Sequence, residues 1–375
     1  MGVGTYAKGA ATLLLAAAAV VAGGVFVGRA SAADVVRYLA PNAAGAMEER
    51  SAEGRIGVED VDKDGIGIHC DSEKTAPDEN PIPTERVLWT QYQDAPLALA
   101  AVRVEIEVGN YEEALQKLND IQEDEINREK YPLVAAEYDW YKASAALRLA
   151  LIAPDSADIV AAGNATRLFI KNYPESYHYY DACLLLADAS YQRSAAAKKE
   201  EKASLLKSAN GAYGQLTKAA SPELQTRGKL GLARVALDSG SLDEALNLFT
   251  EAAEQKEFVV EYSEAQIGVA RTTARMGDPD RAAEILTALL KETPNDSTLR
   301  QARIYNALGD VCADAERTQE AVVAYLHVDL LYPAARAERV YALKALVTAW
   351  RKLNRDDRAQ ETIERLKNRF NVTVE

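Results

Sequence analysis

The chain contains 375 residues, 48% of them hydrophobic, and its 57 acidic against 43 basic side chains give a formal net charge of −14. This excess of acid argues against nucleic acid as a ligand. The three cysteines are an odd number and predict no disulfide framework, and no arrangement of nucleophile and base or phosphate-binding loop can be assembled. We therefore expect a protein that is not an enzyme and requires no cofactor.

Residues 1–32 have the pattern of an export signal. Lys8 precedes an uncharged apolar run over residues 9–28, and Ala30-Ser31-Ala32 offers a small-x-small cleavage site. The run is about 20 residues long, enough to cross a bilayer if it is retained. The pattern predicts a signal peptide or a membrane anchor, with a buried helix as the remaining alternative. We expect an exported protein of the periplasm or cell envelope that meets the membrane only through this segment.

Residues 33–85 differ from the rest of the chain in composition. They are rich in glycine, proline and acidic residues and poor in aromatic residues. Such a composition is typical of segments that cannot bury a core. It predicts a flexible acidic linker between the N-terminal segment and the remainder of the chain.

Part of this segment matches the opening of a calcium-binding loop. Asp60, Asp62 and Asp64 are followed by Gly65, and Asp71 occupies the twelfth position of the loop. The alternative is an acidic turn within a linker. That alternative is favoured because the twelfth residue is not the usual bidentate glutamate and because calcium loops usually work in pairs.

From residue 86 to residue 375 the sequence repeats a pattern of helix, turn and helix. A small residue recurs early in the second helix of each unit, at Ala114, Ala162, Ala209, Ala245, Ala282, Ala321 and Ala359. The last four spacings are 36, 37, 39 and 38 residues. Apolar residues recur four and seven positions after these alanines, which places them on one helix face. Glycine or asparagine stands where the chain must reverse.

The units resemble the tetratricopeptide repeat family. The residues that carry the resemblance are Gly109 to Ala114, Gly240 to Ala245, and Leu308-Gly309 followed by Ala321, Tyr325 and Pro333. The resemblance implies an all-α fold for residues 86–375, a right-handed superhelical solenoid of about seven helical hairpins. It also implies that the first helix of each hairpin lines a concave groove that binds a partner.

A finer resemblance comes from the stretch Phe169 to Ser176 (FIKNYPES), followed by Ala182 and Leu186, with an echo at Leu331-Tyr332-Pro333. This pattern is similar to the long-unit repeats of bacterial cell-envelope proteins, of the outer-membrane-assembly lipoprotein and cell-division coordinator types. It implies the same fold and the same compartment.

Basic residues recur on the side of the first helices that would face the groove. Arg103, Arg234 and Arg271 each stand six residues before a turn glycine. Helical spacing adds Arg227, Arg275, Arg303, Asn306 and Lys344 to the same side, and Asp310 and Asp314 interrupt it. Because arginine binds carboxylates through two hydrogen bonds, the stripe predicts an acidic peptide segment or a C-terminal carboxylate as the ligand. The alternative is a solvated network of internal ion pairs.

Two further groups of residues have simpler interpretations. Cys183 and Cys312 lie among apolar residues of first helices and are expected to be buried thiols. The aromatic-rich stretch that includes Trp140 and Tyr141 is expected to fill helix contacts, with a partner surface as the alternative.

The sequence thus favours an interaction scaffold of the bacterial cell envelope that binds a protein or peptide. The alternative function is a ligand-sensing or regulatory helical-repeat subunit of a larger envelope enzyme complex. A cavity that encloses several ionisable groups would favour that alternative.

Overall fold

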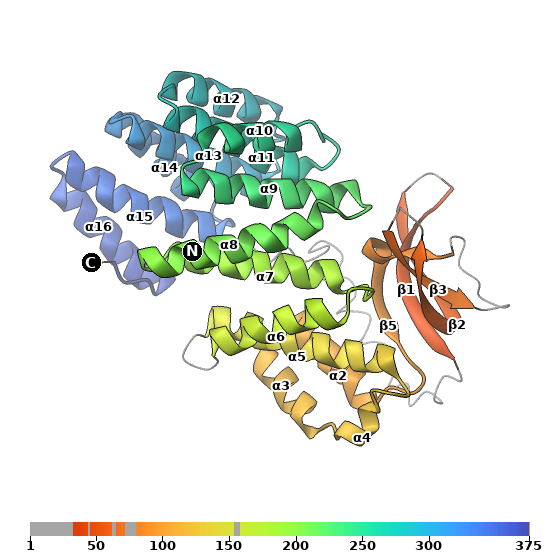
Figure 1. Ribbon diagram of the computed structural model, residues 1–375. Coiled ribbons are helices and arrows are strands. Elements are labelled where there is room, and N and C mark those ends of the chain that lie inside the picture. Colours follow the sequence, from red (N-terminus) through yellow and green to blue (C-terminus); the bar gives the residue numbers. More distant parts are fainter. Residues whose placement is uncertain (1–32, 44–45, 62–64, 72–79, 154–157, 375) are drawn as a thin grey trace. The chain divides into compact units, whose positions relative to one another are not determined.

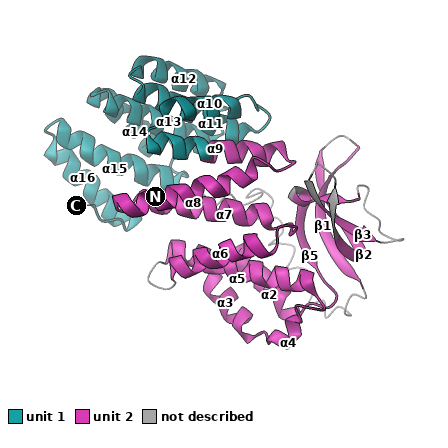
Figure 2. Cartoon of the chain, in the orientation of Figure 1, with its two compact units in different colours: residues 1–24, 232–375 teal, residues 25–231 magenta. Residues whose placement is uncertain are grey.

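The computed structural model of the chain describes residues 33–43, 46–61, 65–71, 80–153 and 158–374 (Figure 1). The predicted signal peptide or anchor at residues 1–32 lies outside these residues. Among the residues described, no helix is both long enough and apolar enough to cross a membrane. The chain divides into two compact units at residues 231 and 232, inside one helix (Figure 2).

The first compact unit begins with a five-stranded antiparallel sheet in the order β4-β3-β2-β1-β5. Its strands are β1 (Asp34–Pro41), β2 (Met47–Val61), β3 (Gly65–Asp71), β4 (Ile82–Pro83) and β5 (Val87–Gln91), with a short 3-10 turn at Thr84–Arg86. Val36, Tyr38 and Ala40 alternate along β1 as buried residues. They share one core with Leu99 and Tyr141 of the helices that follow.

The sheet corrects the prediction of a flexible linker at residues 33–85. Buried and partly exposed residues alternate along β1, as in a strand with one buried face. The glycines, prolines and acidic residues that suggested a linker are also the residues that form turns between strands. The helical repeats accordingly begin at Leu97 rather than at residue 86, because residues 87–91 form β5.

The rest of the chain is an all-α helical repeat solenoid, as predicted. Helices pack as consecutive pairs: α2 (Leu97–Val108) with α3 (Tyr111–Asp120), α5 (Pro132–Ile152) with α6 (Ile159–Asn172), α7 (Tyr179–Ser194) with α8 (Lys199–Leu216), α9 (Pro222–Ser239) with α10 (Leu242–Ala252), α11 (Val259–Arg275) with α12 (Pro279–Glu292), α13 (Thr298–Asp314) with α14 (Thr318–Leu331), and α15 (Arg336–Lys352) with α16 (Asp356–Phe370). One short helix, α4 (Glu123–Ile126), precedes α5.

The seven recurring alanines explain why these segments pair. Each lies in the second helix of its hairpin and is at most 4% exposed. A methyl side chain at that point lets the two helices approach closely. Gly109, Gly240 and Gly277 end the first helices α2, α9 and α11 with positive φ angles of 87°, 85° and 100°, a conformation that glycine adopts without strain.

A second device brings neighbouring helices together through glycines that lie against aromatic rings. A Cβ atom added at Gly231, Gly268 or Gly309 would lie 2.2 to 2.4 Å from the ring of Tyr213, Phe249 or Tyr325, respectively. No side chain fits at such a distance. Because each of these glycines in a first helix has no side chain, it leaves the space that the aromatic ring of a second helix fills.

The predicted burial of the thiols and of the central aromatic residues is confirmed. Cys183 and Cys312 are free and buried, and Cys70, which was expected in the linker, is free and buried in β3. Trp140 and Tyr141 are 6% and 5% exposed, so both fill the core rather than a surface.

Candidate functional site

Four successive first helices carry a connected row of charged side chains, which we call the first-helix ladder. Arg234 of α9 donates to Glu264 of α11 at 3.2 Å, and Glu264 also accepts from Arg303 of α13 at 2.7 Å. Arg303 donates onward to Glu338 of α15 at 3.2 Å, and Asn306 donates to the same carboxylate at 2.9 Å. The four charged side chains are 19% to 26% exposed. The ladder is therefore a half-buried polar surface on which positive and negative charges alternate.

A second cluster on the same helices centres on Asp310 of α13. Arg271 of α11 donates to its carboxylate at 2.8 Å, and the hydroxyls of Tyr325 and Tyr341 each donate to it at distances of 2.8 to 2.9 Å. Burial, followed by the negative charge of Asp310, raises the pKa of both tyrosines well above the usual value. Both tyrosines are therefore held as hydrogen-bond donors, which fixes Asp310 between α11, α14 and α15.

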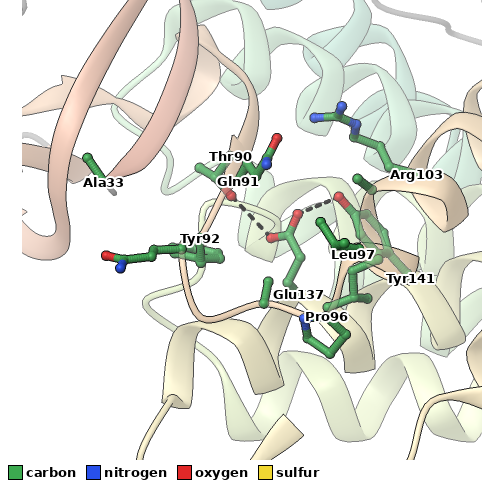
Figure 3. Close-up of a pocket in the computed structure, with 13 residues that line it drawn as sticks. Ala33, Thr90, Gln91, Tyr92, Pro96, Leu97, Arg103, Glu137 and Tyr141 are labelled. Carbon is green, nitrogen blue, oxygen red and sulfur yellow. Dashed lines mark hydrogen bonds between the residues drawn. The ribbon is translucent and has the colours of Figure 1, made fainter. Parts of the chain in front are cut away.

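The other compact unit contains a small cleft with a cavity volume of about 70 Å³ (Figure 3). Its walls come from β5, α2 and α5, and Glu137 of α5 lies at its floor with 5% exposure. Thr90 donates to Glu137 at 3.4 Å, Tyr177 donates to it at 3.1 and 3.2 Å, and Tyr141 forms a further short hydrogen bond to it. Three hydroxyl groups thus satisfy a carboxylate that burial would otherwise make costly.

His178 lies against the same carboxylate. Its Nε2 atom is 3.4 Å from Glu137, and its ring stacks on Trp140 with the ring centroids 4.9 Å apart. Burial alone would lower the pKa of His178, but the charges of Glu137 and Asp181 outweigh burial, so its pKa lies above the usual value. The contact between Glu137 and His178 joins α5 to the start of α7, and the hydrogen bond from Thr90 to Glu137 joins β5 to α5.

Part of the ladder lies in a segment whose sequence matches a known repeat. Residues 236–304, which include Glu264 and Arg303 of the ladder, match the tetratricopeptide repeat. No curated protein matches the chain.

Solved structures with similarity to this chain share little sequence with it. A Rap protein complexed with competence and sporulation factor is 13% identical, with a TM-score of 0.47 over 72% of this chain and 74% of that one. BtubC (BKLC) from P. vanneervenii is 17% identical, with a TM-score of 0.37 over 64% and 89%. A human IFIT1 dimer with PPP-AAAA is 16% identical, with a TM-score of 0.42 over 71% and 59%. At these values the similarity says nothing about the partners of the array.

The structure brings most residues of the predicted stripe together, but carboxylates of the chain itself neutralise their positive charges. Arg234, Arg271, Arg303 and Asn306 all contact carboxylates of neighbouring first helices, as described above. Arg275 donates to the carbonyl oxygen of Leu237 at 2.9 Å and lies 3.9 Å from Asp238. Arg227, in the other compact unit, pairs with Glu223 of its own helix at 2.5 Å. These contacts are the ion-pair network that formed the alternative interpretation of the stripe.

Arg103 of the predicted stripe lies in a different environment. Its guanidinium carbon is 3.9 Å from the centre of the Trp89 ring, and its side chain lines the cleft. Neither Trp89 nor Glu137 was predicted to lie beside Arg103. Glu137 carries one signal in retrospect, because it directly follows the apolar run Leu133 to Ala136 of α5.

The calcium-loop candidate remains a prediction, and the structure describes the backbone of two of its four residues. Asp60 and Asp71 lie in the paired strands β2 and β3, where Asp60 is opposite Ile66 and Asp71 is opposite Arg55. Positions 55 and 60 are five steps apart along the strand, a backbone distance of roughly 16 Å, so Asp60 and Asp71 stand far apart along the paired strands. Asp62 and Asp64 lie outside the described residues. Within the part of the chain that is described, no group of three or more potential ligand residues could hold a metal.

Proposed function

We propose that the chain is a non-enzymatic scaffold for protein–protein interaction in the bacterial cell envelope, and that its partner binds the first-helix ladder. The observation that carries the proposal is the continuity of the ladder across α9, α11, α13 and α15. Stacked repeats produce extended surfaces that suit a long partner better than a small substrate. The tetratricopeptide match covers the centre of this surface.

The ladder suits a partner that carries carboxylates. Ion pairs between partly exposed side chains contribute only about 0.2–1 kcal/mol each. An incoming carboxylate can therefore replace Glu264 or Glu338 on Arg303 at little cost, and Arg303 can bind it through two hydrogen bonds. An acidic segment or a C-terminal carboxylate is thus compatible with the ladder even though its arginines already have partners.

The test compares two double variants of the full chain that lose the same charge. Arg234→Gln with Arg303→Gln removes two arginines of the ladder. Arg281→Gln with Arg358→Gln is the matched control, because these arginines form exposed pairs with Glu284 and Glu361 on the second helices α12 and α16. Each protein is immobilised and exposed to native cell-envelope extract, and the retained proteins are identified.

We expect a partner that is retained by the native chain and by the control but is lost, by at least tenfold (about 1.4 kcal/mol), from the ladder variant. Circular dichroism checks that both variants remain helical. Equal retention by the two variants would refute binding at the ladder. Retention of no protein would refute the scaffold function under these conditions.

The envelope location rests on residues 1–32 and on the long-unit repeat pattern. Fractionation of cells that express the full chain, followed by N-terminal sequencing, tests it. A cytoplasmic protein with an intact N-terminus would contradict export.

A further inference from the structure

The two edges of the N-terminal sheet differ in how they are protected. At one edge, the side chain of Asn80 accepts a hydrogen bond from the backbone nitrogen of Cys70 at 3.1 Å and donates to its carbonyl oxygen at 3.3 Å. The amide of Asn80 thereby continues the pairing of β3 beyond the two residues of β4. Unpaired edge groups of a sheet readily bind another extended chain, and here the backbone groups of Cys70 are covered.

The opposite edge, formed by β5, lacks such protection. Within the described residues β5 pairs only with β1. Its sequence, Val-Leu-Trp-Thr-Gln, contains no charged residue and no proline. Natural proteins usually protect exposed edge strands with those two kinds of residue. An uncharged edge is therefore suited to accept a further strand.

The cleft described above adjoins this edge. Thr90 and Gln91 of β5 form one wall, and Leu97, Ala100 and Arg103 of α2 form another (Figure 3). A strand added to β5 would direct alternate side chains to one face of the sheet. The apolar part of the cleft can receive one such side chain of a few heavy atoms.

Arg103 provides a charge beside the same edge. Its guanidinium lies on the ring of Trp89 of β5, and its nearest described carboxylate, that of Glu107, is 3.7 Å away. The Nε atom of Arg103 is buried and has no hydrogen-bond partner among the described residues. A buried donor without a partner is destabilising, and a carboxylate brought by a ligand would supply charge complementary to this guanidinium.

We propose that the outer edge of β5 and the adjoining cleft bind an extended segment of a partner protein, which adds to the sheet as a strand. The segment places an apolar side chain in the cleft and an acidic side chain on Arg103. A second copy of this chain is a poorer occupant, because each copy has a net charge of −14 and like charges oppose association. This site is separate from the first-helix ladder and does not depend on it.

The probe is a phage-displayed octapeptide library selected on the immobilised full chain. Selected peptides are then synthesised and titrated against four proteins: the native chain, Ala100→Leu, Arg103→Gln and Ala101→Leu. Leucine at position 100 fills the cleft, and glutamine at position 103 removes the positive charge. Ala101→Leu is the matched control, because Ala101 is the next residue of α2, is exposed and does not line the cleft.

We expect selected peptides to contain an acidic residue and an apolar residue. Their affinity should fall at least tenfold for Ala100→Leu and for Arg103→Gln and remain within twofold for Ala101→Leu. Amide hydrogen exchange across residues 87–92 of the native chain should slow when peptide is added. The exchange measurement uses no variant, so the proposal stays testable if one variant fails to fold.

Several results would overturn the proposal. Selection of no peptide, or of peptides that leave the exchange of β5 unchanged, would refute strand addition. Slow exchange of β5 in the free monomeric chain would show that a segment of the chain itself covers the edge. Protection that increases with protein concentration would identify a second copy as the occupant. Peptides affected by Arg303→Gln but not by Ala100→Leu would assign binding to the ladder and leave the proposed scaffold function intact.

Discussion

Replacement of Gly268 by alanine should destabilise the array through one defined clash. The new Cβ atom would lie 2.3 Å from two carbon atoms of the Phe249 ring. Carbon atoms in contact prefer about 3.5–4.0 Å, so the ring or the helix must move by about 1.2 Å or more. Phe249 is 2% exposed, and this leaves the ring little room to move. Overpacking of this kind costs about 1–3 kcal/mol, which exceeds the gain in helix propensity of up to about 1 kcal/mol from glycine to alanine.

Gly163→Ala is the matched control for this substitution. Gly163 is also a buried helical glycine, but its added Cβ atom would meet nothing closer than Arg167 Nη1 at 3.8 Å. We expect Gly163→Ala to raise the thermal midpoint and Gly268→Ala to lower it by about 2–6 °C, measured by circular dichroism. Phe249→Leu in the Gly268→Ala background should recover part of the loss. If Gly268→Ala is as stable as the native chain, the glycine does not act by making space for the ring.

Two further predictions concern ionisable groups. Because the pKa of His178 is raised in the folded state, its contribution to stability should be complete below about pH 6.5 and should decline as the pH rises through the folded pKa. The difference in melting temperature between the native chain and His178→Gln should therefore shrink as the pH rises above about 6.5, and a difference that grows with pH would contradict the sign. Burial raises the pKa of all three thiols, that of Cys183 to about 12. Ellman's reagent should thus react slowly with the thiols of the folded chain. After denaturation it should react with all three thiols. Rapid reaction of any thiol in the folded chain would show that this thiol is accessible.

The helical hairpins could be predicted because their signals are local and repeated. One alanine in each second helix, together with glycine at several of the turns, defines the same helix contact seven times over. A chance match in one unit could mislead, but the same match would have to occur by chance in every unit to give a wrong fold. The glycines that face aromatic rings were harder to recognise, because their spacing from the ring is not constant. Gly231 and Gly268 contact rings of the preceding hairpin, whereas Gly309 contacts the ring of Tyr325 in the same hairpin.

The sheet and the state of the candidate site depended on contacts that are distant in sequence. The strand β5 pairs with β1 across about fifty residues of turn-rich sequence, and composition alone describes a linker equally well. The arginines of the ladder were found from helical spacing, but their partners were not. Glu264 and Glu338 lie about one and three repeats after Arg234, and their side chains reach neighbouring first helices only once the repeats are stacked.

The Asn80 amide that completes β3 has a consequence for how far any assembly can grow. A sheet with two receptive edges can add neighbours without end and so form fibres. Here one edge already carries hydrogen bonds from within the chain, at 3.1 and 3.3 Å, which leaves a single direction for addition. Growth by addition of strands to this sheet is therefore directed to the β5 edge, which disfavours fibres that extend through both edges.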